Sequence, residues 1–143
     1  MSFIMIGTKE SVTRVSGISR GRLWAARLMC GVVVLFMGVD GVGKIAKPAQ
    51  VVGSTLALGF AEKHLVLLGV LGLFCTFLYA VPRTRFLGVL LLTGYLGGAV
   101  AAQVRVDSPL PTHVMFPIYV AVLAWGAIWI TDRRLRNLLL ERV

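Results

Sequence analysis

The polar side chains that could bind a ligand are few, and they stand at the ends of long apolar runs. A carboxylate, two cations, an amide and an imidazole form the set that we expect to meet at one membrane face: Asp40, Lys44, Gln103, Arg105 and His113. These groups could hold a lipid head group, a small anion or a quinone ring. Asp40 is the most informative, because an acid at the edge of an apolar run is usually paired and turned inward. Its natural partners are Arg105 and Lys44, and Lys44 has i,i+4 spacing. The alternative is a structural ion-pair cluster that pins the helix ends.

The sequence contains no motif typical of an enzyme that acts on its own. It contains no nucleophile–base pair, no phosphate-binding glycine loop and no metal-ligand constellation, so we predict no catalytic residue and no metal. Residues 38–44, GVDGVGK, have the wrong spacing for a phosphate loop and end an apolar run. Cys30 and Cys75 lie inside apolar runs without a C-x-x-C motif. Free cysteines of this kind more often pack as small hydrophobes, although a redox pair stays open.

Four apolar runs must position these groups. Of the 143 residues, 57% are hydrophobic and only 15% are charged, whereas soluble domains average about 45–50% and about 25%. A membrane-spanning helix needs about 20 mostly apolar residues. Runs of this kind occupy residues 23–42, 64–81, 86–104 and 114–131. The sequence therefore predicts an all-α fold, a bundle of four transmembrane helices within a lipid bilayer.

The connections divide the chain into one membrane domain with two flanking segments. PRTR at 82–85 predicts a tight hairpin, because Pro82 disfavours helix at the preceding residue. Residues 47–63 are too polar to span, and their apolar spacing favours a short helix in the outer interface over a plain loop. We expect a flexible cytoplasmic leader at 1–22, the transmembrane domain at 23–131 and a basic tail at 132–143.

The basic residues predict the orientation and exclude a nucleic-acid partner. The net charge is +9, but the basic residues flank the apolar runs instead of forming a soluble basic face. Ten Lys and Arg residues fall on the side of both termini and the 82–85 hairpin, against four on the other side. Because cytoplasmic loops carry the excess, we predict a multi-pass protein of the bacterial inner (plasma) membrane with both termini in the cytoplasm.

Small residues recur every four positions in the third run. Helices in lipid associate by close packing, which small residues permit. Packing is therefore predicted for Gly94, Gly97, Gly98, Ala101 and Ala102, with the third helix as the inner one of the bundle. We expect its contacts at Gly69 and Gly72 in the second run and at Gly31 and Gly38 in the first. Whether the stripe packs within one chain or in a homo-oligomer is open.

Several stretches together resemble the DoxX-like family of small four-span bacterial membrane proteins. They are DGVGKIAKP at 40–48, ALGF at 57–60, VPRTRFLGVLLLTGYLGGAVAAQVRV at 81–106 and HVMFPIYVAVLAWGAIWI at 113–130. The resemblance covers about residues 22–136. It implies a link to membrane redox complexes such as a thiosulfate:quinone oxidoreductase, and in a distant eukaryotic branch to receptor assembly. Relatives usually have histidine where this chain has Gln103, so metal or proton chemistry is not implied at that position.

Two functions follow from these observations. The first is a redox-associated membrane subunit with a polar pocket at the outer face, for which a quinone is a candidate cofactor and redox-complex proteins are candidate partners. The second is a non-catalytic assembly or scaffolding protein whose polar residues pair with one another. A transporter or channel ranks lowest, because the middle of the spans is almost free of polar residues.

Overall fold

A computed structural model of the protein describes residues 18–140, apart from the side chain of Leu139. Within this range the chain is helical and has no strand, and its elements are α1 (Arg20–Ala46), α2 (Ala49–Ala57), a 3-10 turn (Glu62–His64), α3 (Leu65–Ala80), α4 (Arg85–Arg105), a π-helical turn (Leu110–Val114), α5 (Met115–Thr131) and α6 (Arg133–Leu140). Four helices in the described part could span a membrane: Arg20–Ala46, Glu62–Ala80, Arg85–Arg105 and Leu110–Thr131. The predicted four-span all-α fold is confirmed.

The surface of the spans is apolar, as a lipid-embedded protein requires. No more than 33% of the apolar window of any span is buried inside the chain. Large side chains such as Leu35, Leu67 and Val122 are more than 60% exposed. A soluble protein could not leave such a surface in water, so lipid is the surrounding medium.

The ends of α1 follow from local chemistry. Ser19 caps its start by accepting a hydrogen bond from the backbone N–H of Arg22 at 3.4 Å. Three residues of the predicted leader, 20–22, thus belong to the helix, and residues 1–17 lie outside the described part. At the other end Lys47 adopts a positive φ of 52°, and its N–H bonds Gly43 O. Pro48, which lacks an N–H, directly precedes α2. Helix α2 is the short helix that the sequence predicted between the first two spans.

A tight hairpin joins α3 to α4, as PRTR predicted. The side chain of Thr84 donates to Leu78 O at 2.9 Å and that of Arg85 donates to Tyr79 O at 3.3 Å, which satisfies two carbonyls at the end of α3. Gly88 allows the two backbones to meet, because a Cβ there would lie 2.2 Å from the backbone nitrogen of Tyr79. Tyr79 is fully buried and donates its hydroxyl to Ala124 O at 3.1 Å, which connects α3 to α5.

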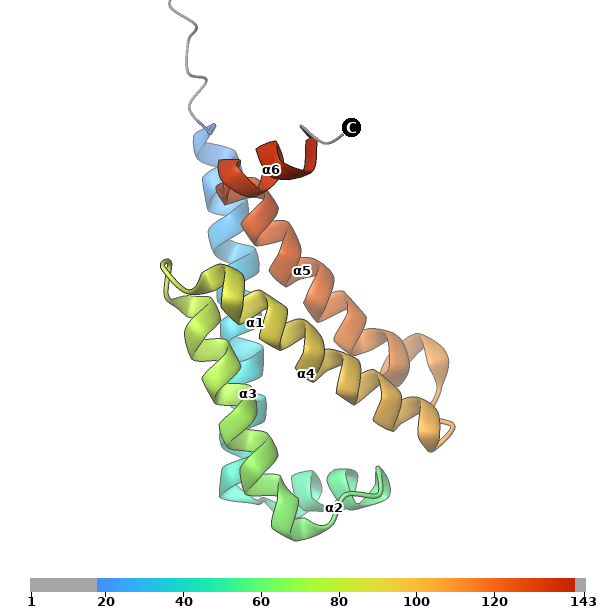
Figure 1. The fold of residues 1–143 in the computed structure, drawn as a ribbon. Helices are drawn as coiled ribbons and strands as arrows, with labels where there is room; N and C mark the ends of the chain where they lie inside the picture. The colour runs from blue at the N-terminus through green and yellow to red at the C-terminus, as the bar shows by residue number, and fades with distance from the viewer. Residues whose placement is uncertain (1–17, 141–143) are drawn as a thin grey trace, which may run out of the picture.

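The four spans form a ring in which each helix has two main neighbours. Helix α1 packs on α3 and α5, and α4 packs on the same two. The α4–α5 pair diverges from the α1–α3 pair as it leaves the hairpin, and α2 lies across the opening between the pairs (Figure 1). We call the end of the bundle that holds the hairpin, the start of α1 and α6 the Arg85 end. The opposite end, with α2 and the end of α4, is the Gln103 end.

The prediction that α4 is the inner helix, packed through its small residues, is wrong within the chain. Gly94, Gly97 and Gly98 are exposed, and a Cβ at any of them would meet nothing within 4 Å. The reason is the divergence, since α4 approaches α3 closely near Gly88 and then leaves it. Ala101 is also exposed, and of the predicted stripe Ala102 alone is buried.

Other glycines provide the close contacts between spans. A Cβ on Gly69 in α3 would lie 2.7 Å from Gly41 O in α1, and one on Gly72 would meet the Tyr95 ring at 3.2 Å. The expected contact of α4 with the second span is therefore found at Gly72, whereas Gly69 packs against α1 and not against α4. The expectation for Gly31 and Gly38 is wrong, because neither has a neighbour within 4 Å and Gly41 takes their place.

Candidate functional site

Asp40 and Lys44 form the predicted i,i+4 ion pair on the last turns of α1. Lys44 Nζ donates to Asp40 Oδ2, and the two side chains are 16% and 33% exposed, respectively. Part-buried charges in an apolar segment are costly unless they neutralise each other. The carboxylate is thus occupied by a residue of its own helix, and it makes no ion pair with Arg105.

Arg105, the last residue of α4, connects that helix to the segment after α2. Its Nη2 donates to Leu58 O at 2.6 Å. The guanidinium lies against Gly59, whose φ is 81°, and a Cβ at Gly59 would lie 2.3 Å from Nη2. A second link at this end joins Lys47 Nζ to Glu62 Oε1 at 3.6 Å. Arg105 thus serves as a clamp between α4 and the α2 segment.

Gln103 and His113 differ from the charged residues, because most of their hydrogen-bonding groups are unused. Gln103 is half-buried, and its amide bonds no residue in the described part of the chain. His113 is exposed, and its Nδ1 lies 2.8 Å from Thr112 Oγ1, while Nε2 has no partner among residues 18–140. Gln103 belongs to α4 and His113 to the π-helical turn, and these two elements contact each other.

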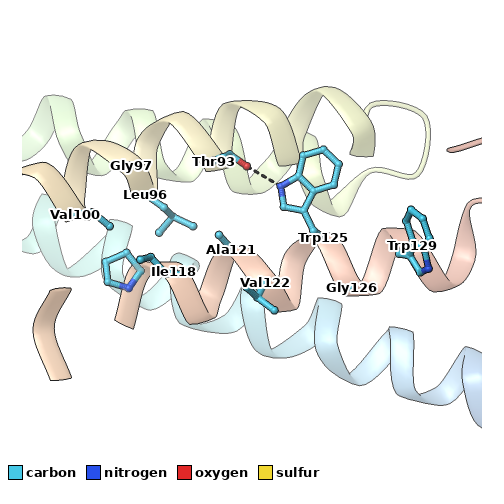
Figure 2. Close-up of a pocket in the computed structure, with 11 residues that line it drawn as sticks. Thr93, Leu96, Gly97, Val100, Ile118, Ala121, Val122, Trp125, Gly126 and Trp129 are labelled. Carbon is cyan, nitrogen blue, oxygen red and sulfur yellow. Dashed lines mark hydrogen bonds between the residues drawn. The ribbon is translucent and has the colours of Figure 1, made fainter. Parts of the chain in front are cut away.

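An apolar groove runs between α4 and α5 toward these two residues. Its volume is about 510 Å³, and it is lined by Thr93, Leu96, Gly97, Val100, Pro117, Ile118, Ala121, Val122, Trp125, Gly126 and Trp129. Figure 2 shows the indole of Trp125 turned toward Thr93, to which its Nε1 donates at 2.9 Å. Gly97 and Ala121 deepen the groove because they carry little or no side chain.

The groove ends below Gln103 and His113. Val100 lines it on α4, and Gln103 lies three residues further on the same helical face. Pro117 lines it on α5, and His113 lies one turn earlier. Pro117 lacks an N–H and cannot bond the His113 carbonyl, and a π-helical turn that ends at Val114 precedes α5.

The five predicted site residues therefore separate into two groups. Asp40, Lys44 and Arg105 are engaged by contacts within the chain. Gln103 and His113 keep unused hydrogen-bonding groups and lie about one turn beyond the groove lining. The groove itself was not predicted. Its sequence signal is weak and consists of small residues on two neighbouring spans, here Gly97 and Ala121.

Both cysteines are free thiols that contribute to packing. Cys75 is buried in the core of the bundle, and Cys30 is half-buried against that core. Within residues 18–140, no three His, Cys, Asp or Glu side chains come together as metal ligands.

Comparison with known proteins identifies a family for this chain, but it finds no similar individual protein. A search of curated proteins and a search of solved structures each returned no match. The model of the DoxX-like family matches residues 28–127. This range extends from the first turns of α1 into α5 and includes Gln103, Arg105 and His113. The chain is therefore a member of the DoxX-like family of four-span membrane proteins.

Proposed function

We propose that this protein is a redox-associated membrane subunit that holds a quinone, with the ring at Gln103 and His113 and the apolar tail in the α4–α5 groove. The observation that carries the proposal is an apolar groove of about 510 Å³ whose lining stops at Val100 and Pro117, about one turn before Gln103 and His113, two neutral side chains with unused hydrogen-bonding groups. Ligand sites are usually apolar clefts of about 300–1,000 Å³ with a few such polar groups.

The chemistry of the two side chains suits a quinone ring. A quinone presents two carbonyl oxygens, which accept hydrogen bonds. Gln103 can donate from its amide nitrogen. The Thr112 hydroxyl lies beside Nδ1 of His113, and when it donates to that nitrogen, Nε2 carries the ring hydrogen as a donor. Both contacts would be made without bringing a charge into the apolar groove.

The second candidate function is assembly or scaffolding without a ligand. The Asp40–Lys44 pair and the Arg105–Leu58 clamp favour it, because these residues satisfy one another and tie the helix ends together. On this reading the Asp40→Asn and Arg105→Gln variants lose folded protein. If these two residues instead bind the ligand, the same variants accumulate normally and lose the ligand.

Purification in mild detergent followed by quinone extraction tests the quinone proposal. The extracted quinone is measured per mole of protein by mass spectrometry. We expect Gln103→Leu and His113→Leu to lower quinone occupancy about tenfold each, the effect of losing a buried hydrogen bond of about 1.4 kcal/mol. Gln50→Leu and His64→Leu are matched controls, because these exposed residues lie outside the groove at the same end. Equal loss in the controls, or no quinone with the unmodified chain, would contradict the proposal.

We propose further that both termini face the cytoplasm of a bacterial inner membrane. The support is the sequence count of ten Lys and Arg residues in the two terminal segments and the 82–85 hairpin, against four in the other connections. Reporter fusions to the two termini and to the 82–85 hairpin test it. Activity of a periplasm-specific reporter at any of the three points would refute this orientation.

The exposed part of the small-residue stripe favours contact with another membrane helix. Gly94, Gly98 and Ala101 follow one another at helical spacing on a lipid-facing surface, where close approach by a partner or a second copy is allowed. Replacing Gly98 by isoleucine should weaken crosslinking between subunits and leave the monomer folded. Unchanged crosslinking would exclude this face as the contact.

A further inference from the structure

A second, polar pocket lies at the Arg85 end, where its Phe86 packs edge to face against Trp125 of the groove. It has a volume of about 280 Å³ and lies between the α3–α4 hairpin and the junction of α5 with α6. Two arginines, Arg83 and Arg85, line it together with Pro82, Phe86, Ile128, Thr131 and Asp132. Nothing in the proposed quinone site uses these residues.

The two guanidinium groups lack a carboxylate partner in the described part of the chain. Arg85 is half-buried, and its Nε donates to Tyr79 O at 3.3 Å, which holds the side chain in place. Among residues 18–140, no acidic group lies within the 4 Å of an ion pair from Arg83 or Arg85. A half-buried cation without a counter-ion is unfavourable, so the terminal nitrogens of Arg85 are suited to an anion from outside the chain.

Asp132 lines the pocket but acts as the cap of α6. Its Oδ1 accepts hydrogen bonds from the backbone N–H groups of Arg134 at 2.8 Å and Leu135 at 3.3 Å. Asp132 is thus held toward the start of α6 and not toward the arginines. Its negative charge still lowers the net charge of the pocket to about one positive unit. That charge matches a monoanion better than a dianion.

Helix α6 places the pocket at the level of lipid head groups. It follows α5 directly and turns across the end of the bundle (Figure 1). Leu135 packs against the core and Leu138, on the same face of the helix, is exposed, whereas Arg134 and Arg136 flank that face on its two sides. Such an amphipathic helix suits the membrane interface, with Leu138 toward the acyl chains.

We propose that the pocket binds the phosphodiester of an anionic glycerophospholipid. A phosphodiester carries one negative charge, which matches the net charge of the pocket, and its oxygens suit the fork of an arginine. Phe86, 47% exposed at the edge of the pocket, and the exposed Leu138 of α6 offer apolar surface to the lipid chains. A free phosphate carries more charge at neutral pH and would leave this apolar surface unused.

Competition between lipids in nanodiscs tests the proposal. The full-length protein is incorporated into phosphatidylcholine discs that contain phosphatidylglycerol, and the lipids retained after transfer to detergent are measured by native mass spectrometry. We expect retention of phosphatidylglycerol over phosphatidylcholine, and Arg83→Gln and Arg85→Gln to weaken it about tenfold, as loss of a charged hydrogen bond predicts. Arg22→Gln is the control, because it removes one positive charge at the same end from an exposed residue that does not line the pocket.

Each alternative result is decisive. Equal weakening by Arg22→Gln would show a diffuse charge effect and overturn the site. Normal retention by Arg83→Gln would overturn it as well, and because Arg83 is exposed on the hairpin this variant folds even if Arg85→Gln does not. Displacement of the lipid by millimolar inorganic phosphate would assign the pocket to free phosphate instead. Quinone content is read from the same samples, so failure here is distinguishable from failure of the quinone proposal.

Discussion

Replacement of Gly88 by alanine should separate α3 from α4 and destabilise the whole bundle. The new Cβ would lie 2.2 Å from the backbone nitrogen and 2.5 Å from the Cα of Tyr79. These are backbone atoms of a helix and cannot rotate away. The helices would have to move apart by about 1.2 Å to bring the shortest contact to 3.4 Å, where ordinary van der Waals contact begins.

The energetic effect of that movement can be worked out from the neighbours. Overpacking a tight contact typically costs about 1–3 kcal/mol. Tyr79 would move with α3, and its hydroxyl bond to Ala124 O, now 3.1 Å long, would be stretched or lost, which adds about 1 kcal/mol. We therefore expect Gly88→Ala to lower the free energy of unfolding by about 2–4 kcal/mol.

Gly94→Ala is the matched control on the same helix. A Cβ at Gly94 meets nothing within 4 Å, and alanine favours helix over glycine by up to about 1 kcal/mol. Unfolding of both variants in mixed micelles with increasing SDS, followed by the fluorescence of the three tryptophans, gives the two free energies. Surface substitutions usually change the free energy of unfolding by no more than about 0.5 kcal/mol. If the unfolding free energies of Gly88→Ala and Gly94→Ala differ by less than this, the close approach of α3 and α4 is refuted.

Three smaller perturbations test other contacts. Gly59→Ala should destabilise the protein, and less so in an Arg105→Gln background, because the new Cβ would collide with the guanidinium. A double-mutant cycle with a coupling below about 0.5 kcal/mol would contradict that clamp. Thr93→Val should shift the tryptophan emission, because it frees the indole of Trp125, and should cost about 0.6 kcal/mol, a typical hydrogen bond between membrane helices. Tyr79→Phe should cost about 1 kcal/mol in the same SDS titration, and a neutral result would mean that the hydroxyl bond adds nothing to stability.

Features that depend on length and local chemistry were predictable from the sequence. The spans follow from the minimum length of an apolar helix, the hairpin follows from Pro82, and the Asp40–Lys44 pair follows from i,i+4 spacing. Each of these involves residues close in the sequence. Their geometry is set by a single helix or turn and needs no knowledge of how the helices cross.

The groove and the clamp were not predictable, because both depend on the angles between helices. Small residues at Gly41 and Gly94 look alike in the sequence, yet a Cβ at Gly41 would collide with Leu73 and one at Gly94 would meet open space. The difference arises because α4 diverges from α3 beyond Gly88. Similarly, no local pattern connects Arg105 with Leu58, which lies 47 residues earlier in the chain.

The two ends of the bundle treat charge in opposite ways, and this difference selects their ligands. At the Gln103 end Lys44 neutralises the carboxylate of Asp40, and Arg105 bonds Leu58 O. The side chains that line the groove itself are all uncharged. At the Arg85 end the carboxylate of Asp132 caps α6, and the guanidinium of Arg85 has no acidic partner in the described range. A neutral molecule loses little solvation on entering an apolar groove, whereas an anion needs a cation beside it. The same chain is therefore suited to a neutral ring at one end and a phosphodiester at the other.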